Sequence, residues 1–293
     1  MPGPNKFAEG LRSGTFMVTC ELDPPKGTDP TKAKKIMDLL KDKVQAVVVS
    51  DNPQARMHMA PIGFCRYLLD QGIEPVMTIT CRDRNRLALQ SDLLAAVGLG
   101  IQNILAVTGD YITWGDHPET KPVYDLDSVQ LIRAISLLNE NKNLSGNGVE
   151  GPSPSFTIGA AVTLAGNPIL PQVLKFRKKV QAGAHFFMSH PIFDLAGVEE
   201  FFKEKRPDRK TPLLASVCLL NETRMREYAP GKYPGLYIPE TVMKKFRTLS
   251  SGEFQAGMMS HTVRLIEEIK KDGRFQGVHL MLNGDEERIV ELI

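Results

Sequence analysis

The sequence is poor in cysteine and has no long apolar run. Its four cysteines lie far apart and form no CxxC pair, so neither a disulfide framework nor a cysteine-ligated metal cluster is indicated, and we expect no metal site. No apolar stretch reaches the roughly 18 residues that a membrane-spanning helix needs. The opening residues, MPGPNKFAEG, lack the apolar core of a signal peptide. We therefore expect a cytoplasmic protein with no membrane insertion.

The sequence also lacks an excess of charge of either sign. Its 36 basic and 34 acidic residues leave a net charge of +2, which gives no broad electrostatic reason to expect nucleic acid or anionic lipid as a partner. The length of 293 residues suits one large α/β domain or two smaller ones. No linker or low-complexity segment divides the chain, so we expect a single domain over residues 1–293. As a separate expectation, this domain forms a homo-oligomer.

Strand-like and helix-like segments alternate along the chain. Right-handed crossovers repeated eight times close into an α/β (β/α)₈ TIM barrel, which we predict here. A doubly wound open sheet is the alternative, and the lack of a GxGxxG after the first strand disfavours it. The predicted strands are 15–22, 44–50, 74–81, 103–110, 156–163, 185–194, 212–218 and 277–282. The predicted helices are 30–42, 57–71, 85–98, 127–139, 169–182, 195–205, 239–250, 255–272 and 284–292.

Polar residues stand where the predicted strands end. In a barrel all of these carboxyl ends meet at one mouth, the face where enzymes of this fold place their sites. The residues are Glu21, Ser50, Asp51, Asn52, Thr78, Thr80, Arg82, Thr108, Gly109, Asp110, Thr163, Ser189 and His190.

Each of these residues also has a structural interpretation. Glu21 is followed by Asp23-Pro24-Pro25, which end the strand. It is therefore either a solvated strand end or an acid placed for chemistry. Asp110 after Gly109 is also typical of a turn.

Some polar residues outside the strand ends are equally ambiguous. The arginines of CRDRNR, at 82, 84 and 86, suit a solvated helix start, an anion site or ion pairs with the two carboxylates. Trp114 and His117 indicate a lid or a surface loop. In the helix at 169–182 we expect Val180 to face inward, whereas two adjacent lysines, Lys178 and Lys179, would ordinarily form a solvated face.

Seven segments together resemble the methylenetetrahydrofolate reductase family, most closely its short bacterial and archaeal members, which lack a regulatory domain. They are CELDPPKG, DNPQAR, TCRDRNRLALQSDLL, LAVTGD, GDHPETKPVYDLDSVQL, IGAAV and KKVQAGAHFFMSHPIFD. The resemblance implies a (β/α)₈ barrel with a non-covalent flavin at the strand ends, FAD before FMN. It also implies reduction of 5,10-methylenetetrahydrofolate to 5-methyltetrahydrofolate.

The resemblance implies roles for individual residues. Glu21, in its Glu-x-x-Pro-Pro setting, stands in the place of the family's catalytic acid. Asp110 matches the aspartate near the flavin ring and the folate. His190 falls where the family usually has a glutamine that hydrogen-bonds the pterin. The positions that match flavin contacts are Ser50, Asp51, Thr78, Gly109, Asp110, Tyr124, Ala161 and Lys179.

Three positions depart from the family's pattern. Many relatives carry Gln-Pro where this chain has His190-Pro191, a His or Gln at Thr78 and an Asn near Thr163. A histidine still donates or accepts a hydrogen bond, and it adds a group that titrates near pH 6.5.

The implied reaction needs an acid beside the pterin. The methylene bridge opens to an N5 iminium, and the departing N10 needs a proton. A carboxyl group supplies it if burial and nearby negative charge raise its pKa towards neutrality. Glu21 on a rigid strand end, with Asp110 across the rim, meets this requirement.

The resemblance implies NAD(P)H or an iron–sulfur protein as the electron source. Family members bind NAD(P)H over the flavin without a Rossmann fingerprint, whereas some short relatives receive electrons through an iron–sulfur partner. Since this chain has no cysteine cluster, such a subunit would be separate. Two alternatives are a reductase of a related pterin with a deazaflavin donor and a non-catalytic pterin- or flavin-binding subunit of a larger complex.

Overall fold

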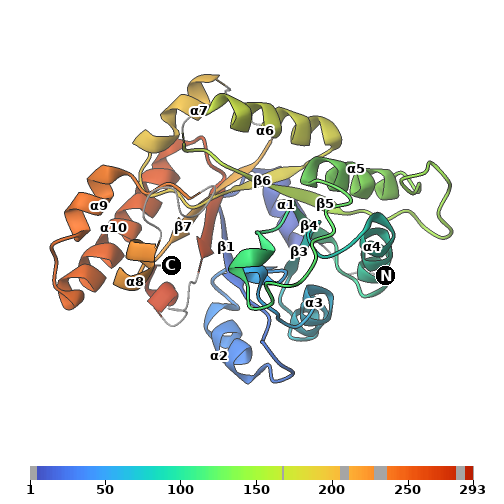
Figure 1. Cartoon of the computed structure of the whole chain (residues 1–293), viewed down its shortest axis with the longest axis horizontal. Helices are drawn as coiled ribbons and strands as arrows, with labels where there is room; N and C mark the ends of the chain where they lie inside the picture. Colours follow the sequence, from blue (N-terminus) through green and yellow to red (C-terminus); the bar gives the residue numbers. More distant parts are fainter. Residues whose placement is uncertain (1–4, 167, 205–210, 228–235, 282–287, 293) are drawn as a thin grey trace.

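The computed structural model describes residues 5–166, 168–204, 211–227, 236–281 and 288–292. Eight parallel strands form a closed barrel in which neighbours follow the chain order and β8 pairs with β1 (Figure 1). This confirms the predicted (β/α)₈ barrel and excludes the open sheet. The strands are β1 (Met17–Leu22), β2 (Ala46–Val49), β3 (Pro75–Thr80), β4 (Asn103–Val107), β5 (Thr157–Val162), β6 (Phe186–Ser189), β7 (Leu213–Cys218) and β8 (Gly277–Met281).

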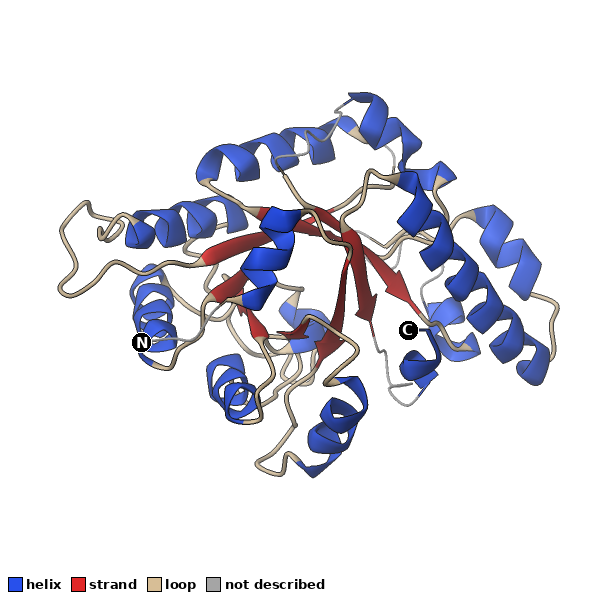
Figure 2. Cartoon of the chain, turned by 180° about the vertical axis from the view of Figure 1, so that it is seen from behind, coloured by secondary structure: helices blue, strands red, loops and turns tan. Residues whose placement is uncertain are grey.

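Helices surround the barrel on its outer side, except the first, Lys6–Ser13, which lies across one end of it (Figure 1 and Figure 2). They are α1 (Lys6–Ser13), α2 (Thr31–Leu40), α3 (Pro61–Asp70), α4 (Arg86–Gly98), α5 (Ser128–Asn139), α6 (Leu170–Ala182), α7 (Glu199–Glu204), α8 (Glu222–Glu227), α9 (Glu240–Phe246) and α10 (Ser251–Asp272). Over the described ranges, none of them is both long enough and apolar enough to cross a bilayer.

The structure differs from the sequence prediction at several places, among them the predicted strand 185–194, which ends at Ser189. Helices α1 and α8 were not predicted. The predicted helix at 284–292 lies largely outside the described residues, and its described part, Arg288–Leu292, is a 3-10 turn. Residue 282, the predicted last position of the eighth strand, also lies outside them.

Side chains alternate between the barrel interior and the helices along each strand. On β1, Cys20 and Leu22 pack with the helix side chains in one large core cluster. Met17 belongs to a second cluster, inside the barrel, with residues such as Val48. Because the period of a strand is two, Glu21 points inward like Met17. This alternation brings the carboxyl group to the interior side of the mouth.

Helix α1 closes the amino-terminal end of the barrel. The buried ring of Phe7 meets Phe186 edge-to-face inside the barrel, with 5.1 Å between the centroids. The Phe7 N–H donates to the Glu74 carboxylate, and the Asn5 side chain donates to Asn103 at the start of β4. The floor of the barrel is therefore sealed, and ligands reach the interior from the opposite end.

The packing of α1 gives a stability prediction. Phe7→Ala removes a fully buried ring and leaves a cavity, so we expect the free energy of unfolding to fall by about 3–5 kcal/mol. Leu39→Ala, at a position of α2 that is 44% exposed, is the matched control and should change it by less than about 0.5 kcal/mol. Denaturant titration of both purified variants measures the two changes. Equal losses would show that α1 does not contribute to the barrel core.

Candidate active site

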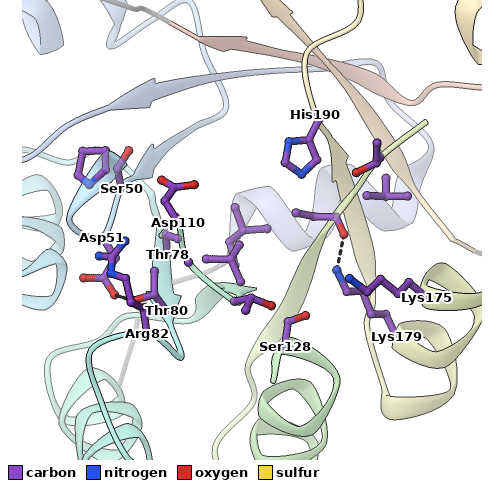
Figure 3. Close-up of a pocket in the computed structure, with 18 of the residues that line it drawn as sticks. Ser50, Asp51, Thr78, Thr80, Arg82, Asp110, Ser128, Lys175, Lys179 and His190 are labelled. Carbon is purple, nitrogen blue, oxygen red and sulfur yellow. Dashed lines mark hydrogen bonds between the residues drawn. The ribbon is translucent and has the colours of Figure 1, made fainter. Parts of the chain in front are cut away.

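A cavity of about 490 Å³ opens at the carboxyl ends of the strands, within the usual size range of small-molecule sites. Figure 3 shows that side chains from opposite sides of the mouth face each other across it. Nine of the ten residues that the resemblance singles out line it: Glu21, Ser50, Asp51, Thr78, Gly109, Asp110, Ala161, Lys179 and His190. The tenth, Tyr124, does not.

Glu21 is the second-last residue of β1, and its partly buried side chain lines the cavity. Burial raises the pKa of its carboxyl group to about 8, with further contributions from the negative charges of Asp23 and Asp110. The buried Pro24 ends the strand directly afterwards, because proline has no N–H for the sheet. At neutral pH this carboxyl group carries a proton that it can donate.

Asp110 lies across the rim, after the end of β4. Its carboxylate accepts a hydrogen bond of 3.0 Å from the backbone N–H of Gln54. The hydroxyl of Tyr124 donates to the backbone carbonyl of Asp110, also at 3.0 Å. Tyr124 therefore lies behind the cavity wall, where it holds the Asp110 backbone.

Asp51 uses its carboxylate for bonds within the protein. It accepts from the backbone N–H and the hydroxyl of Thr80, at 2.9 and 3.1 Å, and forms an ion pair of 2.7 Å with Arg84. Its side chain is fully buried. These bonds tie the end of β2 to the end of β3, so the carboxylate shapes the site as an anchor.

The three arginines of CRDRNR form ion pairs with other carboxylates. Arg82 pairs with Asp83, and Arg86 pairs with Asp125. Arg82 is 1% exposed and borders the cavity. Its guanidinium also donates to the backbone carbonyl of Asn52, so it is already bonded within the protein. Among the described residues no ion pair joins these arginines to Glu21 or Asp110, so the interpretation that they neutralise those two carboxylates is wrong.

One side of the cavity is lined by small residues and contains a buried hydroxyl without a partner. Within the described part of the chain, the Oγ of Ser50 makes no hydrogen bond. A buried hydroxyl without a hydrogen-bond partner is unfavourable unless a bound ligand supplies that partner. Thr78 lies on the same side of the mouth as Ser50 (Figure 3). Gly109 has a φ of +98°, and a Cβ there would lie 2.8 Å from the Cβ of Arg82, so the strand end itself requires glycine.

Lys179 lies opposite and is buried, which makes the expectation of a solvated position wrong. It follows the buried Phe176 by three positions and so shares the inward face of α6, whereas Val180 is only half-buried. Its Nζ donates to the carbonyl of Ala161 at 2.7 Å. Burial, with the charge of Lys175, lowers the pKa of Lys179 to about 8.

His190 comes directly after β6 and completes this side of the cavity. Burial, with the positive charge of Lys179, lowers the pKa of His190 to about 4. The imidazole is therefore neutral at physiological pH, with one nitrogen that donates a hydrogen bond and one that accepts.

Sequence reasoning missed several lining residues that helices and loops contribute. They are Pro53, Tyr111, Ser128, Gln172, Lys175 and Phe176. A helical spacing relates Gln172, Lys175 and Lys179, which would have grouped them once Lys179 was placed at the mouth. Trp114, interpreted as a lid or surface residue, lines the cavity, whereas His117 is exposed and pairs with Asp116.

Comparison with known proteins gives a family match over nearly the whole chain. The family described as methylenetetrahydrofolate reductase matches residues 6–293. A Caenorhabditis elegans protein described as a probable methylenetetrahydrofolate reductase (NADPH) is 22% identical over 231 residues. The matched region covers 76% of this chain and 32% of that relative, so the chain spans about a third of the relative's length.

Solved structures show the same fold at low identity. An uncharacterised protein from Clostridium thermocellum that binds two copies of 5-methyl-5,6,7,8-tetrahydrofolic acid has a TM-score of 0.68 and 13% identity, over 98% of this chain and 96% of that one. EDTA monooxygenase from Chelativorans sp. BNC1 has a TM-score of 0.56 and 12% identity, over 95% and 92%. With the family match spanning residues 6–293, the chain belongs to the methylenetetrahydrofolate reductase family.

Proposed function

We propose that this barrel reduces the methylene bridge of 5,10-methylenetetrahydrofolate to the 5-methyl group, with Glu21 as the proton donor. The observation that carries the proposal is the inward carboxyl group at the end of β1, whose pKa is raised to about 8. The family match and the solved relative that binds a methylated tetrahydrofolate support a folate as the substrate.

A flavin fits the residues around the cavity. The unpartnered Ser50 hydroxyl offers a hydrogen bond, the small side chain of Ala161 leaves room for a flat ring, the Gly109 backbone lines the cavity, and the Lys179 ammonium group offers a charged donor. We assign these residues, with Thr78, to flavin binding, and Asp51 and Tyr124 to the support of the walls. A reduced flavin supplies a hydride when bound.

Glu21 provides the proton that the folate needs. It protonates N10 as the C–N10 bond of the bridge breaks, which leaves an iminium between N5 and the former bridge carbon. That carbon then accepts the hydride and becomes the methyl group. The proton from Glu21 and the hydride together account for the two hydrogens added, and Glu21 regains its proton from solvent.

Asp110 and His190 have supporting roles in the proposal. The Asp110 carboxylate raises the pKa of Glu21 and stabilises the positive charge of the iminium by its own negative charge. Neutral His190 presents a donor and an acceptor to the polar edge of the pterin.

We propose NAD(P)H as the reductant. The name of the nematode relative specifies NADPH. The alternative, an iron–sulfur donor, would be a separate protein, since the described residues contain no group of three or more His, Cys, Asp or Glu side chains able to hold a metal ion.

The acid role is tested by Glu21→Gln, which keeps the shape of the side chain and removes the acid. We expect the variant to bind flavin normally and to lose folate reduction by at least about a hundredfold. Steady-state kinetics and the flavin absorption spectrum measure the two properties. Turnover close to that of the wild type would refute the assignment.

The pH profile tests the cause of the raised pKa. Glu21 acts in its protonated form, so kcat should fall as the pH rises through about 8. Asp23→Asn removes a negative charge that raises the pKa of Glu21, so the alkaline limb should move to lower pH while the rate at low pH is kept. Asp38→Asn, on the exposed side of α2, should leave the profile unchanged. A limb that stays in place in Asp23→Asn contradicts the electrostatic explanation.

Adjacent lysines on α6 test the flavin site. Lys179→Met should weaken flavin binding about tenfold or more, because it removes a charge-assisted donor from the cavity. Lys178→Met removes the same charge from the exposed neighbouring position and should have no effect. Titration of flavin-free protein followed by flavin fluorescence gives both affinities. If Lys179→Met and Lys178→Met bind flavin with affinities within about twofold of each other, Lys179 does not contribute to flavin binding.

A further inference from the structure

Two aromatic residues at the cavity mouth have no role in the proposed chemistry. Tyr111 follows Asp110 directly, and Trp114 ends the short 3-10 turn Ile112–Trp114; both line the cavity. Their rings are 5.2 Å apart at 81°, an edge-to-face pair. Tyr111 is 59% exposed, and Trp114, the one tryptophan of the chain, is half-buried. Large aromatic rings that border a cavity and remain exposed indicate a surface that a ligand covers.

The turn that carries these rings is fixed to the neighbouring loop after β2. The carboxylate of Asp116 accepts from the backbone N–H of Met57, at 3.1 and 3.3 Å to its two oxygens. Gly115 packs so closely that a Cβ there would collide with the carbonyl of Ala55. With the bond from Gln54 to Asp110, three contacts join the two loops. The protein itself therefore holds the backbone of the turn that carries the two rings.

The loop after β2 is strained where it meets this turn. Asn52, Gln54 and Ala55 all have positive φ angles, of 44°, 54° and 56°. Non-glycine residues in this region carry a cost that only the surrounding structure can hold, and such strain concentrates at ligand sites. Here the strained residues lie in the loop that contacts the turn with the aromatic pair.

We propose that Tyr111 and Trp114 bind the aryl ring of the folate's p-aminobenzoyl arm. The inference rests on the proposed function, which places the reacting bridge beside Glu21 and Asp110. N10, one end of that bridge, is bonded directly to the aryl ring. The arm therefore begins at the reacting atoms and leaves through the mouth of the cavity. Tyr111, the first residue of the aromatic pair, follows Asp110 directly at this mouth. Packing of flat rings supplies affinity for the arm without a part in the proton or hydride transfer.

Substitutions of Trp114 test this assignment in the holoenzyme. The assay oxidises methyltetrahydrofolate with an artificial electron acceptor, so NAD(P)H is not needed. We expect Trp114→Ala to raise the KM for methyltetrahydrofolate about tenfold with little change in kcat, and Trp114→Phe to restore most of the affinity. A tetrahydropterin that lacks the arm should inhibit the wild type and Trp114→Ala with the same inhibition constant. Tyr237→Ala, at an exposed tyrosine outside the cavity, is the matched control.

The fluorescence of the single tryptophan gives a second readout. Emission from Trp114 in the wild type should change when methyltetrahydrofolate binds and should not change with the armless pterin. An unchanged KM in Trp114→Ala, or an equal loss of affinity for the armless pterin, would overturn the assignment. In a separate assay of NAD(P)H oxidation, a raised KM for NAD(P)H together with an unchanged KM for methyltetrahydrofolate would overturn the assignment and place the pair at the nicotinamide nucleotide. Failure of the wild type to oxidise methyltetrahydrofolate would reject the proposed function itself, a result distinct from these.

Discussion

The alternation of side chains along the barrel strands decides what the cavity contains. Each strand sends every second side chain inward, so the last inward position of a strand lies at the mouth. On β1 that position is Glu21, and directly after β6 it is His190. A shift of one residue in β1 would place Glu21 among the apolar helix contacts and bring Leu22 into the cavity. The chemistry of the site therefore depends on the register of the barrel.

Burial has opposite effects on the acids and bases that face this cavity. It raises the pKa of Glu21 to about 8 and lowers those of Lys179 and His190 to about 8 and 4, because in each case it disfavours the charged form. Near neutral pH the site thus holds a protonated acid, a neutral imidazole and an ammonium group close to its titration point. Glu21 and His190 thus offer a proton and hydrogen bonds without adding a positive charge beside the proposed iminium.

Local sequence patterns predicted the strand order and the mouth of the barrel, because strand period and polar strand ends are local features. Helix α1 carries local signals that were overlooked, since Asn5 caps its start and Gly14 ends it in the left-handed region, but its place in the barrel floor depends on the distant contact of Phe7 with Phe186. Helical periodicity allowed either Lys179 or Val180 to follow Phe176 on the inward face, at three or four positions, and the apolar Val180 was preferred over the charged side chain that the structure buries. The anchoring role of Asp51 depends on Thr80 and Arg84, which the fold brings to it from the next strand end.

The central claim is that Glu21 is a protonated acid at neutral pH, and infrared spectroscopy tests it without any turnover. The difference spectrum between the wild type and Glu21→Gln isolates the carboxyl band of this one residue. The protonated band should disappear with a midpoint near pH 8. A midpoint near 4.5, the ordinary value for glutamate, would contradict the account.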